Sequence, residues 1–321
     1  MKGKKTLGIL LIVIGVVALF NMINFEGESL LKKVFKSFTN DLSMEEKYDL
    51  DDIKHLSVED SSINITVLQG NSSQAVVRME GSVSKNLFDD YKLEGQRDGD
   101  TLHIRTKSGD GWNWFTWSTV KLTIELPPKQ WEEVTINSSS GNITVDQLLS
   151  AKLSLKTSSG NIKAEKIDGH DLSLRTSSGN IKLLQATGDE LELKSSSGNI
   201  TIEEYKATQL DLHSVSGNIK AIEGTSEIVA QSTSGNITIE SDDLLYDADL
   251  KSTSGNVSVA LRNDPTSLAI DFNAGSGIGK IKKDAFVYED NDKDRDDFRG
   301  AFGTGDTKLK VRTSSGNFTL K

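Results

Sequence analysis

The sequence predicts an all-β protein built as a parallel β-solenoid with coils of about 19 residues. The tripeptide Ser-Gly-Asn occurs eight times in the second half of the chain, and its glycines are almost evenly spaced from Gly141 to Gly255. Between the copies, apolar and polar residues alternate with period two, which is typical of short strands with one buried face. Such units bury their apolar side only by stacking on one another, so they predict a repeat array.

The coil that begins at Gly160 shows how each unit is built. Ile162 and Ala164 alternate with charged residues, and Leu172 and Leu174 alternate with Ser and Arg further along. Each strand is expected to pair with its equivalent in the next coil, about 4.8 Å away. The Thr and Ser residues after the leucines are expected to point inward and to hydrogen-bond along the stack. A set of antiparallel hairpins is the alternative, since Gly and Asn also form hairpin turns.

The Ser-Gly-Asn copies are predicted to form the corners between strands. Gly adopts positive φ freely and Asn tolerates it, which suits a sharp corner, and the Asn side chains are expected to form a ladder. Eight copies without a recurring histidine argue for a structural role rather than a catalytic serine. The predicted corner residues are Gly141, Asn142, Gly160, Asn161, Gly179, Asn180, Gly198, Asn199, Gly217, Asn218, Gly235, Asn236, Gly255, Asn256, Gly316 and Asn317.

Composition excludes several kinds of site. The 321 residues include no cysteine, so neither a disulfide nor a thiolate metal site is expected, and the net charge of −10 argues against nucleic acid as a partner. No cofactor is predicted.

A polysaccharide-cleaving enzyme needs clustered acids or metal ligands on one exposed face. The exposed column after each corner instead carries Thr144, Lys163, Lys182, Thr201, Lys220, Thr238 and Ser258. The next exposed column has one acidic pair, Asp146 and Glu165, and no enzyme is expected.

Residues 1–24 are predicted to be a membrane anchor. Lys2, Lys4 and Lys5 precede an apolar stretch over residues 6–23, which is near the minimum length for crossing a bilayer. This charge distribution predicts a cytoplasmic N-terminus and an extracytoplasmic remainder in the cell membrane. A cleaved signal peptide is the alternative, although no clear Ala-x-Ala site follows.

Residues 25–50 are predicted to form an amphipathic helix and a linker. Glu28–Phe38 has apolar residues on one helical face and lysines on the other, so it lies on the membrane, packs on the end of the solenoid, or forms a stalk. Thr39–Leu50 is polar and acidic and is expected to be the linker.

The remaining chain divides into two predicted regions. Residues 51–135 form an irregular β region, in which Asp60–Val67 reads as a degenerate repeat with Ile63 in the place of the glycine. Residues 136–321 form the regular repeats, with a worn copy at Gly277 and an acidic insertion at about 283–305. Pro127-Pro128 marks the transition, because proline interrupts strand ladders.

The chain resembles a family of bacterial β-solenoids, the putative-adhesin family. The resemblance lies in an N-terminal anchor, the strand Gly99–Ile104, the step Leu122–Pro127 and the Ser-Ser-Gly-Asn-Ile repeats, and it covers about residues 53–321. LiaG-like membrane-anchored proteins of Gram-positive bacteria belong to this family. The resemblance implies an envelope location and a link to envelope stress, and it supplies no catalytic residues.

Two departures from the repeat are candidate functional segments. A loop with Trp112, Trp114, Phe115 and Trp117 is expected either to contact glycan or the bilayer interface, or to pack as a lid on the solenoid. Tyr288–Arg299 has alternating aspartates like a calcium loop, but lacks its glycine and final glutamate, so a solvated insertion is predicted, with weak calcium binding as the alternative.

These observations predict a non-enzymatic, adhesin-like scaffold that presents threonine and lysine ladders to an anionic cell-wall polymer or a protein partner. The alternative is a regulatory or sensory ectodomain of an envelope-stress system, which would act through a membrane partner because the short cytoplasmic tail cannot signal alone. A polysaccharide-active enzyme is the lesser alternative.

Overall fold

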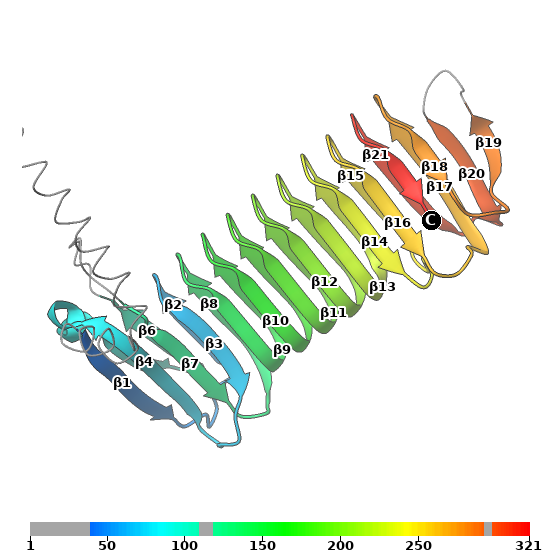
Figure 1. Ribbon diagram of the computed structural model, residues 1–321. Coiled ribbons are helices and arrows are strands. Elements are labelled where there is room, and N and C mark those ends of the chain that lie inside the picture. The colour runs from blue at the N-terminus through cyan, green and yellow to red at the C-terminus, as the bar shows by residue number, and fades with distance from the viewer. Residues whose placement is uncertain (1–38, 109–117, 292–296) are drawn as a thin grey trace, which may run out of the picture.

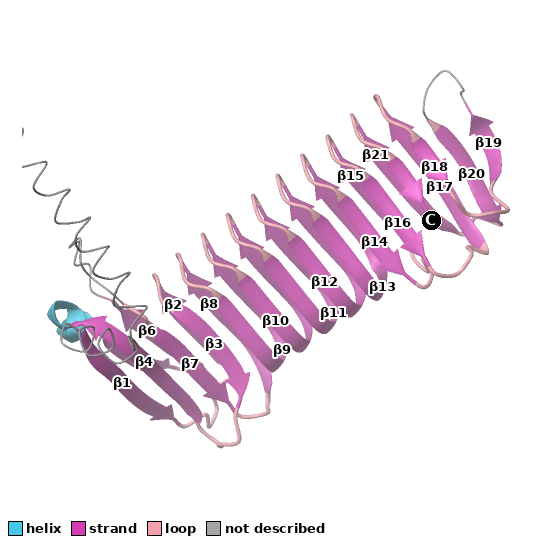
Figure 2. Ribbon diagram, in the orientation of Figure 1, coloured by secondary structure: helices cyan, strands magenta, loops and turns pink. Residues whose placement is uncertain are grey.

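The computed structural model describes residues 39–108, 118–291 and 297–321 as one elongated stack of strands (Figure 1). The predicted anchor and amphipathic helix lie outside these residues. Within the described part of the chain, no helix is long and apolar enough to span a membrane. Strands dominate, and the loops gather at the edges of the stack (Figure 2).

Five long strands form the regular part of the stack. They are β9 (Ile143–Thr157), β10 (Ile162–Thr176), β11 (Ile181–Ser195), β12 (Ile200–Ser214) and β13 (Ile219–Ser232). Each pairs in parallel with the next coil, and Ile162 lies opposite Ile143 and Ile181. The parallel stacking is therefore confirmed, and the hairpin alternative is wrong for these coils.

Each long strand bends once and so contributes to two sheet faces. The bend lies at a residue with positive φ: Gln147, Lys166, Gln185, Glu204 and Glu223, with φ between 51° and 57°. The residues after each corner, such as 143–146, form the first face, and those before the next corner, such as 152–157, form the second face. Buried side chains such as Val145 and Leu155 fill the space between the faces.

The corners hold adjacent coils together by hydrogen bonds. The hydroxyl of Thr176 donates to the carbonyl of Gly160 (3.0 Å) and accepts from the N–H of Gly179 (3.1 Å). Asn161 donates from its backbone N–H (2.8 Å) and its amide (3.1 Å) to Oδ1 of Asn142. The Thr157 and Thr176 positions point inward as predicted, but the Ser159 and Ser178 positions are exposed, so that part of the prediction is wrong.

The corner glycines do not adopt positive φ, contrary to the prediction. Positive φ among the described glycines occurs at Gly81, Gly99, Gly303 and Gly305. The corner requires glycine because the coils approach too closely there for a side chain. A Cβ on Gly198 would lie 1.8 Å from the carbonyl oxygen of Gly179.

At the N-terminal end, the order of coils in space differs from their order in the chain. The strands are β2 (His55–Asp60), β3 (Asn64–Gln69), β6 (Thr101–Lys107), β7 (Lys121–Leu126) and β8 (Gln130–Ser138). The β2–β3 coil lies between the β6–β7 coil and the β8–β9 coil. The carbonyl of Ile63 lies against Gly141, as the degenerate repeat predicts.

Antiparallel strands cap this end. β4 (Ala75–Ser84) pairs with β7, β1 (Thr39–Tyr48) pairs with β4, and β5 (Lys92–Asp98) pairs with β6, while the 3₁₀ helix η1 (Lys85–Asp90) follows β4. The prediction of a linker over Thr39–Leu50 is therefore wrong. Leu42 is buried, and the polar residues around it suit an edge strand exposed to water.

The C-terminal end contains the remaining strands of the described chain. They are β14 (Ile237–Ser241), β15 (Ala248–Ser252), β16 (Val257–Leu261), β17 (Ser267–Ala274), β18 (Gly279–Ile281), β19 (Val287–Asn291), β20 (Phe298–Gly303), β21 (Thr307–Thr313) and β22 (Phe318–Leu320). The last coil, β21–β22, lies between the β15–β16 coil and the β17–β18 coil. The worn repeat at Gly277 therefore stacks on Gly316.

The acidic insertion contributes to the cap at this end. β20 pairs antiparallel with β17, and β19 pairs antiparallel with β20. Phe298 and Phe302 are buried, so the prediction of a solvated insertion is wrong for these flanks. The acidic positions 292–296 lie outside the described residues.

Candidate functional site

Two of the predicted functional features fall in parts of the chain that the structure leaves undescribed. The aromatic positions Trp112, Trp114, Phe115 and Trp117 lie within 109–117, between β6 and β7. Asp292, Asp294 and Asp296 also lie outside the described residues. In the described part of the chain, no group of three or more metal-ligating side chains is present.

On the first face, the predicted lysine column is neutralised by its neighbours. Lys163 pairs with Glu165 (3.1 Å), as Lys182 does with Glu203 (3.3 Å) and Lys220 with Glu240 (3.0 Å). These lysines therefore form ion pairs along the face instead of an unpaired cationic ladder.

The acidic pair of Asp146 and Glu165 has the electrostatics of an ion-pair network. Lys166 lies 3.9 Å from Asp146 and 4.0 Å from Glu165. The hydrogen bond from Lys163 lowers the pKa of Glu165. A general acid requires the opposite shift, because it must hold a proton near neutral pH.

The second face arranges its charges in rows that run along the stack. We call the outward position immediately before each buried corner Ser or Thr the basic row. Strand register places its members opposite one another in successive coils. They are Lys156, Arg175, Lys194, His213, Gln231, Lys251 and Arg312. Four residues earlier in each coil lies a second row, which we call the acidic row after Asp171, Glu190, Glu227 and Asp247; the same position holds Lys152, Gln209 and Lys308 in the coils of Lys156, His213 and Arg312.

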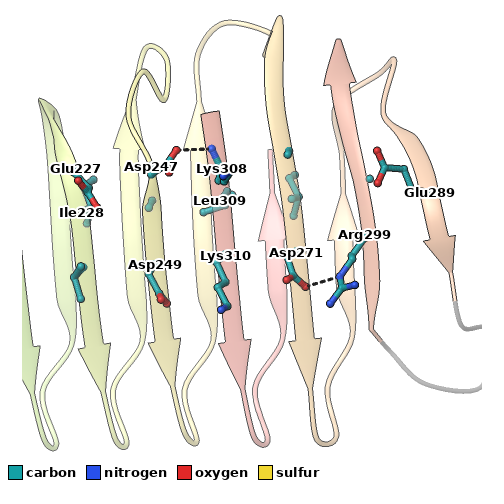
Figure 3. Close-up of a pocket in the computed structure, with 15 residues that line it drawn as sticks. Glu227, Ile228, Asp247, Asp249, Asp271, Glu289, Arg299, Lys308, Leu309 and Lys310 are labelled. Atoms are coloured by element: carbon teal, nitrogen blue, oxygen red, sulfur yellow. Dashed lines mark hydrogen bonds and ion pairs between the residues drawn. The ribbon is translucent and has the colours of Figure 1, made fainter. Parts of the chain in front are cut away.

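Two hollows open on the second face, and both are lined by Val229. The C-terminal hollow, of about 480 Å³, lies across β13, β15, β21, β17, β20 and β19 (Figure 3). The middle hollow, of about 400 Å³, is lined by Lys194, Asp211, Leu212, His213, Val229 and Gln231. Val229 and Ala269 are shorter than the charged residues beside them, so the face is lower at these positions.

Charged side chains surround the C-terminal hollow. Arg312, just beyond its lining, binds both carboxylate oxygens of Asp249 at 2.6 Å, and Nε of Arg299 lies 3.3 Å from Asp271. Asp247 accepts a hydrogen bond from the backbone N–H of Lys308 (2.8 Å). Within the described residues, the ammonium groups of Lys308 and Lys310 form no ion pair with a carboxylate. The hollow thus offers both cations and carboxylates above an apolar floor (Figure 3).

Beside the basic row, the carboxylate of Glu192 forms ion pairs with two cations, Arg175 and Lys194. Burial opposes ionisation of Glu192, but hydrogen bonds from Lys194, Arg175 and Ser173 outweigh it and lower the pKa of this carboxyl. Glu192 is therefore an anion that stabilises both basic side chains.

The sequence did not indicate these hollows. Val229 and Ala269 lie on different coils, and one of the two strands between them, β21, comes from the end of the chain. The alternating pattern shows that each residue points outward, but the neighbours across the coils are known only from the topology.

The fold defines a repeat protein of the β-solenoid class, with coils stacked in parallel and capped at both ends. The family model Toastrack DUF4097 matches residues 53–321, and the chain belongs to this family. The comparison with curated proteins gives no match.

Several solved structures show some likeness to this chain. A putative adhesin of Bacteroides fragilis is 15% identical, with 87% of this chain and 97% of that chain covered and a TM-score of 0.43. A putative lipid binding protein of Parabacteroides distasonis is 17% identical, with 88% and 97% covered and a TM-score of 0.42. Likeness at this level does not extend to function.

Proposed function

We propose that this protein is a non-enzymatic, adhesin-like binding scaffold of the cell envelope whose second face receives the ligand. The observation that carries the proposal is the difference between the two faces. The first face pairs its column lysines with glutamates, and its hollow lies beside the N-terminal cap, against Leu68, Arg78 and Glu125. The second face is hollowed along β13 to β21 and retains cations that form no ion pair among the described residues. The second face therefore has the open charged surface that binding needs.

The carboxylates of the described residues support a non-enzymatic role. The one acidic pair predicted from the sequence, Asp146 and Glu165, is contacted by lysines, and the pKa of Glu165 is lowered. Neither feature suits acid–base cleavage of a polysaccharide.

The proposal places the hollows away from the bilayer. Residues 6–23 would cross the cell membrane with the N-terminus inside, as their apolar character and the lysines before them favour. The described chain begins with β1 at one end of the stack, and the C-terminal hollow lies near the other end (Figure 1). A ligand in the cell wall would then be held at a distance from the membrane.

The test uses substitutions that place large side chains in the hollows without changing the net charge. Full-length protein in liposomes is mixed with purified cell wall, and retention is compared between the natural chain and a Val229→Tyr/Ala269→Tyr variant. We expect the natural chain to be retained and the variant to be lost. Thr201→Tyr/Thr238→Tyr on the first face is the matched control and should be retained.

Two results would contradict the proposal. Equal retention of both variants would remove the second face as the ligand surface. Absence of wall retention, together with a stoichiometric membrane protein that co-purifies in mild detergent, would favour the regulatory ectodomain instead.

A further inference from the structure

The basic row brings like charges close together across the regular coils. Lys156, Arg175 and Lys194 occupy the same register position in three successive coils, and adjacent strands lie about 4.8 Å apart. Like charges directly opposite one another on neighbouring strands destabilise a sheet. The stack therefore has an energetic cost along this row.

Ion pairs within the protein offset only part of this cost. Arg175 and Lys194 share Glu192, and Arg312 pairs with Asp249. Lys156 and Lys251 are exposed and have no ion pair within the described residues. The five Lys and Arg residues of the row thus have two carboxylate partners, whereas each column lysine of the first face has its own. The first face thus neutralises its lysines one by one, whereas the second face neutralises the basic row only in part.

Hydrogen-bond donors lie beside the basic row at the corners. Ser158 and Ser159, two and three residues after Lys156, expose their side chains, and their hydroxyl groups have no partner within the described residues. Asn161 follows, and its amide uses one N–H on Asn142, which leaves the second N–H for a ligand. Arg175, Lys194 and Lys251 are likewise followed by two exposed Ser or Thr residues, whereas His213 is followed by Val215 and Gln231 is not a cation.

The width of this surface restricts what fits on it. The basic row is one side chain wide. On the side away from the corner, the next outward row includes Glu192, Asp211 and Asp249, and the acidic row lies one outward position further. A bilayer surface or a nucleic-acid duplex would extend over Asp171 and Glu190. A single narrow chain lying along the stack axis avoids these carboxylates.

We infer that the basic row binds a linear polymer of phosphodiester-linked units, laid along the stack from Lys156 towards Arg312. Each phosphodiester keeps one negative charge and offers two free oxygens, which match a cation and a corner hydroxyl or amide in one coil. The middle hollow between Lys194 and Gln231 gives room for the neutral part of a unit. This inference deepens the proposed function, on which it rests for the location of the ligand, by naming the ligand class.

The test uses purified full-length protein in detergent and a synthetic poly(glycerol phosphate). Binding is measured by calorimetry over a range of salt concentrations, for the natural chain and for Lys156→Gln/Lys251→Gln. These lysines are exposed and form no ion pair within the described residues, so the variant should keep the circular dichroism spectrum and unfolding midpoint of the natural chain. We expect binding about tenfold weaker at low salt. The slope of log affinity against log salt should fall by about 1.4, as two lost phosphate contacts predict.

The matched control is Lys163→Gln/Lys182→Gln, which makes the same change in net charge on the first face. It should bind the polymer as the natural chain does. Equal weakening by both double variants would overturn the inference, because it would show an effect of net charge alone.

A second polyanion tests the assignment to phosphodiesters. Alginate, a polycarboxylate without phosphodiesters, is expected to bind at least tenfold more weakly than poly(glycerol phosphate). Equal binding of alginate, or no binding of poly(glycerol phosphate), would overturn the inference. Retention on purified wall with unchanged binding by Lys156→Gln/Lys251→Gln would overturn it while leaving the proposed function in place. Polymer binding without wall retention would overturn only the proposed function.

Discussion

At the residue scale, the corners show how one glycine is required by its neighbour in the next coil. Gly198 faces the carbonyl of Gly179, and Gly217 faces that of Gly198 in the same way. The hydroxyl group before each corner then satisfies the buried backbone donor and acceptor there, as Ser195 does with Gly179 and Gly198. The recurrence of Ser-Gly-Asn is thus explained by close stacking.

The sequence predicts the positions of these corners but not the reason for them. A glycine suits both positive φ and close approach, and the tripeptide alone does not separate the two. The positive φ values lie instead at the opposite bend, at residues such as Gln147 and Lys166, whose types have no marked preference for that conformation. The second bend therefore had no sign in the sequence.

Replacement of a corner glycine tests the steric explanation. In Gly198→Ala the new Cβ would lie 1.8 Å from the carbonyl oxygen of Gly179, so the coils must separate. We expect a loss of roughly 3 kcal/mol in the free energy of unfolding, measured with urea. Gly99→Ala is the control, since Gly99 has φ of 60° and open space around it, and its cost should be about 1 kcal/mol. A larger loss at Gly99 than at Gly198 would contradict the steric account.

At the element scale, the residues that follow the bend of each long strand, which we call the bend column, show how side chains of different size stack in successive coils. In successive coils this column holds Leu148, Ile167, Ala186, Tyr205 and Gly224. The large Tyr205 lies between the two small residues, and its ring occupies the space that a side chain at Gly224 would need. Strand β13 is also one residue shorter than β12, and the register shifts between Lys206 and Gln209.

The alternation of apolar and polar residues predicts the regular strands, but the polar sequence of β1 gives no such signal. The leucine and isoleucine columns mark β9 to β13 because every coil repeats the same buried positions. β1 lacks this pattern, since only Leu42, Met44 and Tyr48 contact the core and polar or charged residues separate them. An edge strand requires little burial, so a polar sequence is compatible with both a strand and a linker.

A double-mutant cycle tests the packing of the bend column. In Gly224→Ala the new Cβ would lie 2.3 Å from the Tyr205 ring, and we expect a loss of about 2 kcal/mol in the free energy of unfolding. Tyr205→Ala should cost about 3 kcal/mol, because it leaves a cavity. In the double variant the clash is absent, so the total loss should be smaller than the sum by about 1 kcal/mol or more. Additive losses in urea unfolding would contradict direct packing of the two residues.

At the scale of the whole molecule, both ends of the stack place coils out of chain order. β2–β3 lies inside β6–β7, and β21–β22 lies inside β17–β18. The Ser-Gly-Asn copy at Gly316 shows that this segment is a repeat, but its place between Gly255 and Gly277 depends on contacts across 61 and 39 residues. Periodicity predicts that coils stack, and it does not predict which coils are neighbours when the chain doubles back.

This topology predicts that removal of the last coil disrupts folding more than removal of a coil in the middle of the stack. Deletion of residues 307–321 would remove β21 and β22, whose Leu309, Val311, Phe318 and Leu320 are fully or almost fully buried. It would also remove the pairing partner of four strands, β15, β16, β17 and β18. We expect loss of the cooperative thermal transition of the C-terminal part, measured by circular dichroism.

Deletion of residues 161–179 is the matched experiment, because it removes one complete coil and leaves Asn180 to follow Gly160. The strands β9 and β11 carry the same buried columns, so β11 should stack directly on β9 in the register that both now share with β10. In a stack whose stability is a sum over neighbouring coils, such a deletion shortens the array without opening it. We therefore expect a single cooperative transition with a slightly lower midpoint. A truncated chain without 307–321 that unfolds as cooperatively as the chain without 161–179 would show that β17–β18 closes onto β15–β16, and that the inserted coil is not required to hold the C-terminal cap.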